Sequence, residues 1–326
     1  MGSWEVLVTR RLPAAGMSLI EERCRVRLWE EDRPIPRENL LAMASGVEGI
    51  VCLLSDPIGA EAMEAAGPGL KVVSTMAVGY DNIDLAEAAR RGILVGNTPG
   101  VLTEATADLT WALILSAGRR IVEGDRMVRE GRFNGWGPTL LVGADFHGKT
   151  MGIVGLGRIG SAVARRARGF DMNILYSNRR RLPPDKEREL GAAFVSVDEL
   201  CREADFISLH CPLNPESRHL INRERIALMK PNAYLINVAR GPVVDEPALV
   251  EALKEKRIAG AAFDVYEKEP ELAPGLAELD NAVLAPHLGS ASIETRDQMA
   301  MMTAKNLLAA LEGRLPPWCV NPEVKK

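Results

Sequence analysis

Short apolar runs rich in β-branched residues alternate with helix-period segments along most of this chain. The first group of predicted strands is Glu5–Thr9, Val26–Trp29, Gly49–Leu54, Lys71–Met76 and Ile93–Asn97. The second group is Met151–Gly155, Asn173–Ser177, Phe194–Val197, Asp205–His210, Tyr234–Val238, Gly260–Val265 and Val283–Ala285. Helices are predicted between the strands, among them Arg37–Ala44, Leu85–Arg91, Arg158–Arg168, Arg223–Met229 and Pro247–Lys256.

Strands separated by helices predict parallel sheets that are covered on both faces. Two groups of strands therefore predict an α/β chain with two doubly wound, Rossmann-like domains and a ligand cleft between them. Two long helices, Thr103–Arg120 and Ser292–Glu312, join the groups, and too little chain follows the second helix to build another domain. We expect one discontinuous domain, residues 1–101 plus 291–326, and one inserted domain, residues 102–290.

Composition narrows the class of protein without identifying it. The 326 residues are 47% hydrophobic and 26% charged, with a net charge of −4, which indicates a globular protein without a nucleic-acid or membrane-binding surface. The five cysteines form no C-x-x-C pair, so neither a disulfide scaffold nor a metal site is expected. No signal peptide or membrane span is recognised, and we expect a cytoplasmic protein.

The most specific motif is a glycine-rich loop that follows a predicted strand and opens a predicted helix. It has the pattern G-x-G-x-x-G and reads Gly155-Leu156-Gly157-Arg158-Ile159-Gly160. In this context the glycines permit a tight turn, a close approach of pyrophosphate to the backbone, and close packing of helix on strand. The pattern predicts that residues 102–290 bind a dinucleotide, which makes the discontinuous, flavodoxin-like domain the substrate domain.

The residues after the next strand bear on which dinucleotide binds. An NAD site usually has Asp or Glu about 20 residues after the glycine loop, to bind the ribose 2′-hydroxyl. Asn178 stands 23 residues after Gly155, followed by Arg179 and Arg180, and no carboxylate lies from Tyr176 to Arg181. Guanidinium groups favour a 2′-phosphate, so NADP is the expected cofactor and NAD the alternative.

Three polar residues follow three predicted strands, which places them at one edge of the sheet. They are Arg240, Glu269 and His287. Histidine suits proton donation near neutral pH, and arginine suits binding of a carboxylate. A carboxylate beside an imidazole favours its protonated form. Together they indicate reduction of a 2-oxo acid, although each residue alone is more often an ordinary loop residue.

These motifs, in this order, make the chain similar to the D-isomer-specific 2-hydroxyacid dehydrogenases over almost its whole length. The motifs are the glycine loop, His210-Cys211-Pro212-Leu213, Asn237-Val238-Ala239-Arg240-Gly241, Asp264-Val265-Tyr266-Glu267-Lys268-Glu269-Pro270 and Pro286-His287-Leu288-Gly289-Ser290. The resemblance implies that Arg240 binds substrate, Glu269 partners His287, and His287 is the acid/base. It also implies that Asp264 holds the nicotinamide amide, and we expect Cys211, Pro212, Val238, Ala239 and Gly289 to line the cofactor.

Other features resemble the glyoxylate/hydroxypyruvate reductase branch of that family. The loop with Val78 and Gly79 matches the one that gives backbone N–H groups to the substrate carboxylate. Trp136 is a candidate to border the pocket of a dimer partner, with a plain interface role equally open. We expect a homodimer, because no side of the apolar Thr103–Arg120 helix is expected to face water. D-3-phosphoglycerate or another D-2-hydroxyacid dehydrogenase, and a dinucleotide-sensing corepressor, remain alternatives.

Overall fold

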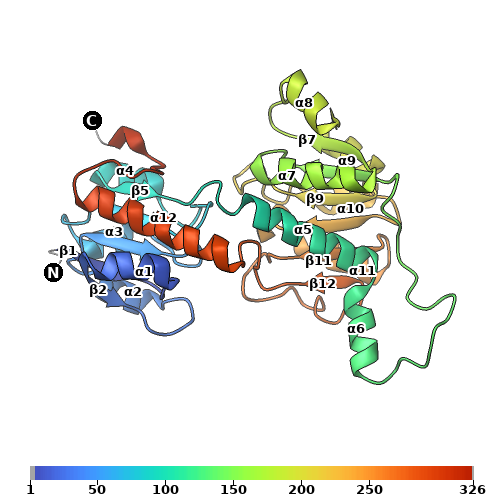
Figure 1. Ribbon diagram of the computed structural model, residues 1–326, viewed down its shortest axis with the longest axis horizontal. Helices are drawn as coiled ribbons and strands as arrows, with labels where there is room; N and C mark the ends of the chain where they lie inside the picture. Colours follow the sequence, from blue (N-terminus) through green and yellow to red (C-terminus); the bar gives the residue numbers. More distant parts are fainter. Residues whose placement is uncertain (1–3, 325–326) are drawn as a thin grey trace. The chain divides into compact units, whose positions relative to one another are not determined.

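The computed structural model describes residues 4–324 and divides into two compact units. Unit 1 is Met1–Leu102 with Ser290–Lys326, and unit 2 is Thr103–Gly289. Each unit has one parallel sheet with helices on both faces, so the prediction of two doubly wound α/β domains is confirmed (Figure 1). Within residues 4–324, no helix is both long and apolar enough to span a bilayer.

Unit 1 has a five-stranded sheet in the order β2-β1-β3-β4-β5, the order of flavodoxin-like folds. Its strands are β1 (Trp4–Val8), β2 (Cys24–Leu28), β3 (Gly49–Cys52), β4 (Val72–Thr75) and β5 (Leu94–Gly96). Its helices are α1 (Ala14–Glu21), α2 (Arg37–Ala44), α3 (Ala60–Ala66), α4 (Leu85–Arg91) and α12 (Ile293–Leu311).

Helix α12 returns from the far end of the sequence to complete the core of unit 1. Its Met299 and Leu307 are buried in one cluster with Val6 and Val8 of β1, on one face of the sheet. The other face is covered by α2 and α3. At Gly16 of α1, a Cβ would lie only 2.4 Å from the backbone of α12, so the two helices pack at close range.

Unit 2 has a seven-stranded sheet in the order β12-β11-β10-β9-β6-β7-β8. Its strands are β6 (Thr150–Val154), β7 (Asn173–Ser177), β8 (Ala192–Phe194), β9 (Phe206–Leu209), β10 (Tyr234–Asn237), β11 (Gly260–Phe263) and β12 (Ala282–Leu284). Its helices are α5 (Thr103–Gly118), α6 (Ile121–Arg129), α7 (Arg158–Ala167), α8 (Pro184–Leu190), α9 (Val197–Glu203), α10 (Arg223–Leu228) and α11 (Glu246–Lys254). The strand order reverses between β6 and β9, and ligands of such sheets bind at the carboxyl ends beside the reversal.

Two local predictions differ from the structure. The strand predicted at Phe194–Val197 lies at Ala192–Phe194 instead, and Val197 begins α9. The Ser196 hydroxyl accepts a hydrogen bond from the Glu199 amide at 3.1 Å, and this N-cap turns the chain into a helix. Val195 and Val197 stand two residues apart, which is the period of a strand, and this spacing led to the wrong prediction.

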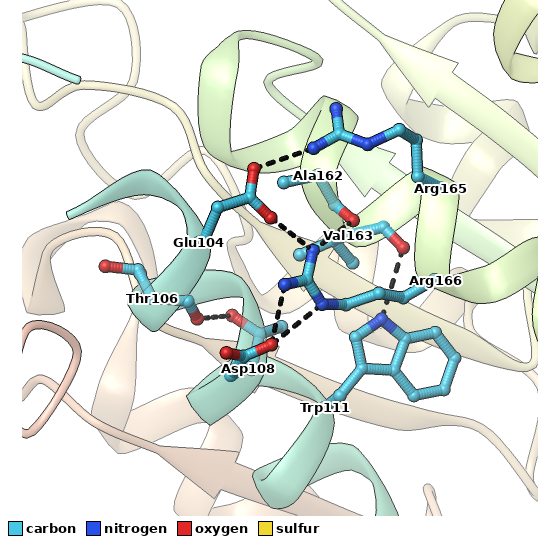
Figure 2. A network of polar contacts seen from close by, with 9 residues as sticks. Glu104, Thr106, Asp108, Trp111, Ala162, Val163, Arg165 and Arg166 are labelled. Carbon is cyan, nitrogen blue, oxygen red and sulfur yellow. Dashed lines mark hydrogen bonds and ion pairs between the residues drawn. The ribbon is translucent and has the colours of Figure 1, made fainter. Parts of the chain in front are cut away.

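The helix predicted at Thr103–Arg120 ends at Gly118, and it does have a face exposed in the single chain. Glu104, Asp108 and Ala112 are exposed along that face. Figure 2 shows Glu104 and Asp108 pairing with Arg165 and Arg166 of the neighbouring α7, at 2.6 to 2.9 Å. Exposed pairs of this kind contribute little to stability, so the buried side of α5 provides most of its attachment.

Candidate active site

The glycine-rich loop joins β6 to α7, and its three glycines have different surroundings. Gly155 has a φ of 97°, and a Cβ there would lie 2.6 Å from the amide nitrogen of Cys211. A Cβ at Gly160 would lie 2.4 Å from the carbonyl oxygen of Gly155. A Cβ at Gly157 would meet no atom within 4 Å, so the loop is open to an incoming group at this point.

The start of α7 supplies unpaired donors beside that opening. The first intrahelical bond runs from the Ser161 amide to the Gly157 carbonyl at 2.9 Å. The N–H groups of Arg158, Ile159 and Gly160 precede that bond and have no partner within the helix. Such a terminus attracts phosphate, so the loop fits the pyrophosphate of a dinucleotide.

The segment after β9 lies against the glycine loop, as the close approach of Gly155 and Cys211 shows. The ring nitrogen Nε2 of His210 lies 2.8 Å from the Ser208 hydroxyl, and its Nδ1 is buried without a partner. Burial lowers the pKa of His210 to about 3, so the ring is neutral near pH 7. His210, Cys211 and Pro212 can therefore form a wall of the dinucleotide site, but His210 is unsuited to donate a proton.

The turn after β10 is shaped by a residue to which the sequence motifs assign no role. The Asn237 side chain accepts a hydrogen bond from the Ala239 amide at 3.1 Å and donates to the Arg240 carbonyl at 3.0 Å. Asn237 is buried, so these bonds fix the Val238–Arg240 turn. A Cβ at Gly241 would lie 1.8 Å from the Tyr266 carbonyl oxygen, so only glycine lets this turn meet the loop after β11.

His287 and Glu269 form the central pair of the site. The Nδ1 atom of His287 lies 2.9 Å from a carboxylate oxygen of Glu269, and the other oxygen accepts from the Tyr266 amide at 3.1 Å. His287 has a φ of 56°, a left-handed conformation that is uncommon outside glycine and concentrates at functional sites. Because the pair uses Nδ1, the Nε2 atom is left to meet a substrate.

The electrostatics of this pair keep its carboxylate ionised. Burial acts to raise the pKa of Glu269. The hydrogen bond and charge of His287, together with the charge of Arg240, act to lower this pKa and outweigh the effect of burial. The net pKa of Glu269 lies below its ordinary value. The structure thus brings Arg240, Glu269 and His287 to the same edge of the unit 2 sheet, near enough for their charges to interact.

Asp264 holds the segment that follows His287. Its two carboxylate oxygens accept hydrogen bonds from the Leu288 amide at 2.6 Å and the Gly289 amide at 2.8 Å. Burial raises the pKa of Asp264, although those bonds and the charge of His287 oppose the rise. Asp264 therefore fixes the backbone beside the histidine, whatever else it binds.

The loop that carries Glu269 is held by a second buried carboxylate. Glu246, in the first turn of α11, accepts hydrogen bonds from the Glu267 amide at 2.7 Å and the Ala273 amide at 2.9 Å. The ring of His219 lies 2.7 Å from the Glu267 carboxylate. Neither contact could be expected from local sequence, because the partners are 21 to 48 residues apart.

The segment after β7 contains the residues expected to select the dinucleotide. The Asn178 side-chain oxygen accepts a hydrogen bond from the Leu156 amide at 2.6 Å, which ties the segment to the glycine loop. Arg179 and Arg180 are exposed. Among the contacts of residues 4–324, no hydrogen bond or ion pair engages the guanidinium group of Arg179 or Arg180. Arg181 instead binds Glu187.

The remaining candidates belong to other segments of the chain. Val78 and Gly79 belong to unit 1, in the loop after β4, where the Val78 carbonyl accepts a hydrogen bond from the Asn97 side chain at 2.8 Å. Trp136 follows α6 in unit 2 and is 86% exposed. Within the described part of the chain, no group of three or more His, Cys, Asp or Glu side chains is arranged to hold a metal ion.

Comparisons with known proteins show which proteins this chain resembles. Residues 111–289 match the family model described as the D-isomer specific 2-hydroxyacid dehydrogenase, NAD binding domain. A curated relative, the glyoxylate reductase of Thermococcus onnurineus, is 50% identical over 324 residues, which cover 98% of this chain and 96% of the relative.

Two solved structures are similar over almost their full length. A protein from Thermus thermophilus matches with a TM-score of 0.90 and 48% identity, covering 97% of this chain and 99% of its own. An NADPH-dependent glyoxylate/hydroxypyruvate reductase from Sinorhizobium meliloti, in complex with NADP and malonate, matches with a TM-score of 0.84 and 31% identity. That match covers 98% of this chain and 97% of the other.

We predict that Glu246→Gln loosens the loop that carries Glu269. An amide in place of the carboxylate cannot accept from both backbone N–H groups, and a buried donor left without a partner costs about 1–3 kcal/mol. The free energy of unfolding should fall by that amount in urea titrations, and the Glu267 and Ala273 amides should exchange hydrogen faster. Glu251→Gln, on the exposed side of α11, is the control and should change neither. Unchanged exchange at both amides in Glu246→Gln contradicts the prediction.

Proposed function

The chain belongs to the D-isomer specific 2-hydroxyacid dehydrogenase family, and we propose that this protein reduces glyoxylate and hydroxypyruvate with NADPH. The proposal rests chiefly on the His287–Glu269 pair, held at 2.9 Å at the edge of the unit 2 sheet. Its substrate class is supported by about 50% identity to a curated glyoxylate reductase over nearly the whole chain.

His287 is the proposed proton donor. A reduced nicotinamide, when bound, would supply the hydride for the carbonyl carbon, and the carbonyl oxygen then needs a proton from the protein. The Nε2 atom of His287 can deliver that proton, because Nδ1 is engaged by Glu269. The ionised carboxylate of Glu269 stabilises the imidazolium and fixes the orientation of the ring.

Arg240 is the proposed ligand of the substrate carboxylate. Its position after β10 is fixed by the bonds of Asn237, and its guanidinium charge polarises a 2-oxo acid in the direction that hydride transfer requires. Backbone N–H groups at Val78 and Gly79 are proposed as further ligands of the carboxylate. Trp136 is proposed to border the pocket of a partner subunit, where its large exposed ring would be covered.

The dinucleotide is proposed to bind along the carboxyl ends of β6, β7 and β9. The N–H groups of Arg158, Ile159 and Gly160 would hold the pyrophosphate. Cys211, Pro212, Val238 and Ala239 would line its path, Gly289 would lie near the nicotinamide, and Asp264 would accept from the nicotinamide amide. Asn178, Arg179 and Arg180 would surround a 2′-phosphate, and the NADPH-dependent relative from Sinorhizobium meliloti supports that choice.

A homodimer is proposed because unit 2 exposes apolar side chains along α6 and the loop after it. They include Ile121 at 57%, Val128 at 62%, Phe133 at 51% and Val142 at 64% exposure. Figure 1 shows that α6 and this loop project from the rest of unit 2. Apolar surface of this extent on a projecting segment is typical of an interface.

We expect sedimentation to show a dimer at micromolar concentration. A second copy would cover the apolar side chains of the projecting segment. Val128→Asp combined with Phe133→Asp should shift the protein toward the monomer, and Arg132→Asp on the same loop is a control for added charge. A single species of about 35.5 kDa in the unmodified protein contradicts the dimer.

His287→Ala should lower kcat by about 10²- to 10⁴-fold, the usual contribution of a positioned proton donor. His287→Asn is the companion variant, because asparagine tolerates the left-handed backbone at this position and removes only the acid. His147→Ala, an exposed histidine remote from the site in sequence, should leave kcat unchanged. Near-normal turnover in both variants at position 287, with folding intact, would exclude His287 as the donor.

Glu269→Gln should move the alkaline limit of reduction to lower pH. Reduction needs the protonated ring and is lost as pH rises and the ring gives up its proton. The pKa of Glu269 lies below its ordinary value. The carboxylate is therefore ionised throughout this range and holds the proton on the ring. Without that anion the ring loses its proton earlier. A kcat-against-pH profile measures the shift; Glu271→Gln, exposed on the same loop, should leave the profile in place.

NADPH should be preferred over NADH by roughly 10- to 100-fold in kcat/KM, because charge-assisted bonds to phosphate contribute about 1.5–3 kcal/mol before screening. The preference should appear in KM and narrow as salt is raised. Asn178→Asp with Arg179→Ala should reverse it. Arg188→Ala, which removes a nearby cation on α8, should not. Equal kcat/KM for the two cofactors at low salt in the unmodified protein is the contrary result.

A further inference from the structure

A buried tyrosine lies beneath the segment that contains Arg179 and Arg180. Tyr176, in β7, has a fully buried side chain. Its hydroxyl donates a hydrogen bond to a carboxylate oxygen of Glu187 at 2.6 Å and accepts one from the Leu182 amide at 2.8 Å. One side chain of the sheet therefore fixes the backbone at the point where the segment leaves for α8.

Arg181 binds the same Glu187 carboxylate as Tyr176. Its guanidinium donates two hydrogen bonds to Glu187, at 2.8 and 2.9 Å, and lies 5.9 Å from the ring centre of Phe194. The bonds from Arg181 and Tyr176 lower the pKa of Glu187 to about 2, so the carboxylate stays ionised at every working pH. Arg181 is thus committed to a partner within the protein.

The segment is consequently held at both ends. At the near end the Asn178 side chain binds the Leu156 amide at 2.6 Å, and at the far end the Leu182 amide binds Tyr176. Only the backbone between these two hydrogen bonds can change its conformation. Arg179 and Arg180 lie in that stretch and are exposed. The anchors restrict the directions in which these two guanidinium groups can point.

We propose that Tyr176, Glu187 and Arg181 are positioning residues for cofactor selection, which hold Arg179 and Arg180 ready for a 2′-phosphate. The proposal rests on the NADPH preference proposed above. None of the three residues contacts the phosphate. They act by ordering the segment before binding, so that the ordering cost does not reduce affinity for the phosphorylated cofactor.

The test measures binding of the adenosine end alone. Calorimetry gives the Kd of 2′,5′-ADP, which has the 2′-phosphate, and of 5′-AMP, which lacks it. Tyr176→Phe removes both hydrogen bonds of the hydroxyl and leaves every charge in place. It should weaken 2′,5′-ADP by roughly 5- to 30-fold, the effect of reordering about one backbone residue. The Kd of 5′-AMP should change much less, and the same selective change should appear in KM for NADPH against NADH, with kcat unaltered.

Two further variants guard the interpretation. Arg181→Lys keeps the positive charge but cannot make the two parallel bonds to Glu187, and it should lower the 2′,5′-ADP preference in the same direction. Tyr234→Phe, a buried tyrosine at the start of β10, is the matched control and should leave the preference unchanged. If Tyr176→Phe is too unstable to study, Arg181→Lys carries the test.

Arg179→Ala distinguishes failure of the positioning role from failure of the NADPH proposal. If Arg179→Ala weakens 2′,5′-ADP while Tyr176→Phe and Arg181→Lys leave its Kd unchanged, the NADPH proposal stands and the positioning role is wrong. If the unmodified protein binds 2′,5′-ADP no better than 5′-AMP, the NADPH proposal fails, and the positioning role fails with it. Equal weakening of both ligands in Tyr176→Phe also overturns the proposal, because it indicates a general structural defect.

Discussion

Carboxylates that accept hydrogen bonds from loop backbone are the interaction on which the site depends, and two of them, Asp264 and Glu246, are buried. Asp264, Glu246 and Glu269 together accept five backbone N–H groups in the loops after β11 and β12. Those amides lie beyond the ends of the strands and have no partner in the sheet, so an acidic side chain must supply one. The same charges that hold the loops also set the electrostatic surroundings of His287.

This arrangement explains how irregular backbone can hold the geometry of the candidate site. The left-handed conformation of His287 is uncommon for a histidine and requires support from its surroundings. Asp264 supplies that support from one side, and Glu269 from the other. Because Gly241 has no side chain, the turn that contains Arg240 packs directly against the loop after β11. The backbone therefore fixes the positions of Arg240, Glu269 and His287, the three side chains proposed to carry out the chemistry.

Much of the fold and of the candidate site could be predicted where the physical cause is local in sequence. The helices Arg37–Ala44 and Leu85–Arg91 were predicted with the observed bounds. The glycine pattern located the β6–α7 loop, in which Gly155 has a φ of 97° and Gly160 packs against the Gly155 carbonyl. The strand near Phe194 was misplaced because an N-cap overrode an apolar alternation. The roles of Asn237 and Glu246 could not be predicted, since their partners are set by the fold. The sequence also does not reveal that Arg181, unlike Arg179 and Arg180, binds a carboxylate of the protein.

The discontinuity of unit 1 has a consequence for the order in which this protein acquires its structure during synthesis. Residues 103–289 form unit 2 as one uninterrupted stretch, whereas the sheet of unit 1 lacks the cover of α12 until residues 293–311 have been made. The first domain to leave the ribosome is therefore the last to be completed. Until then the apolar side chains of β1 and β3 that α12 buries lie open to water. The nascent chain thus passes through a long interval in which its amino-terminal sheet is a target for chaperones and for aggregation.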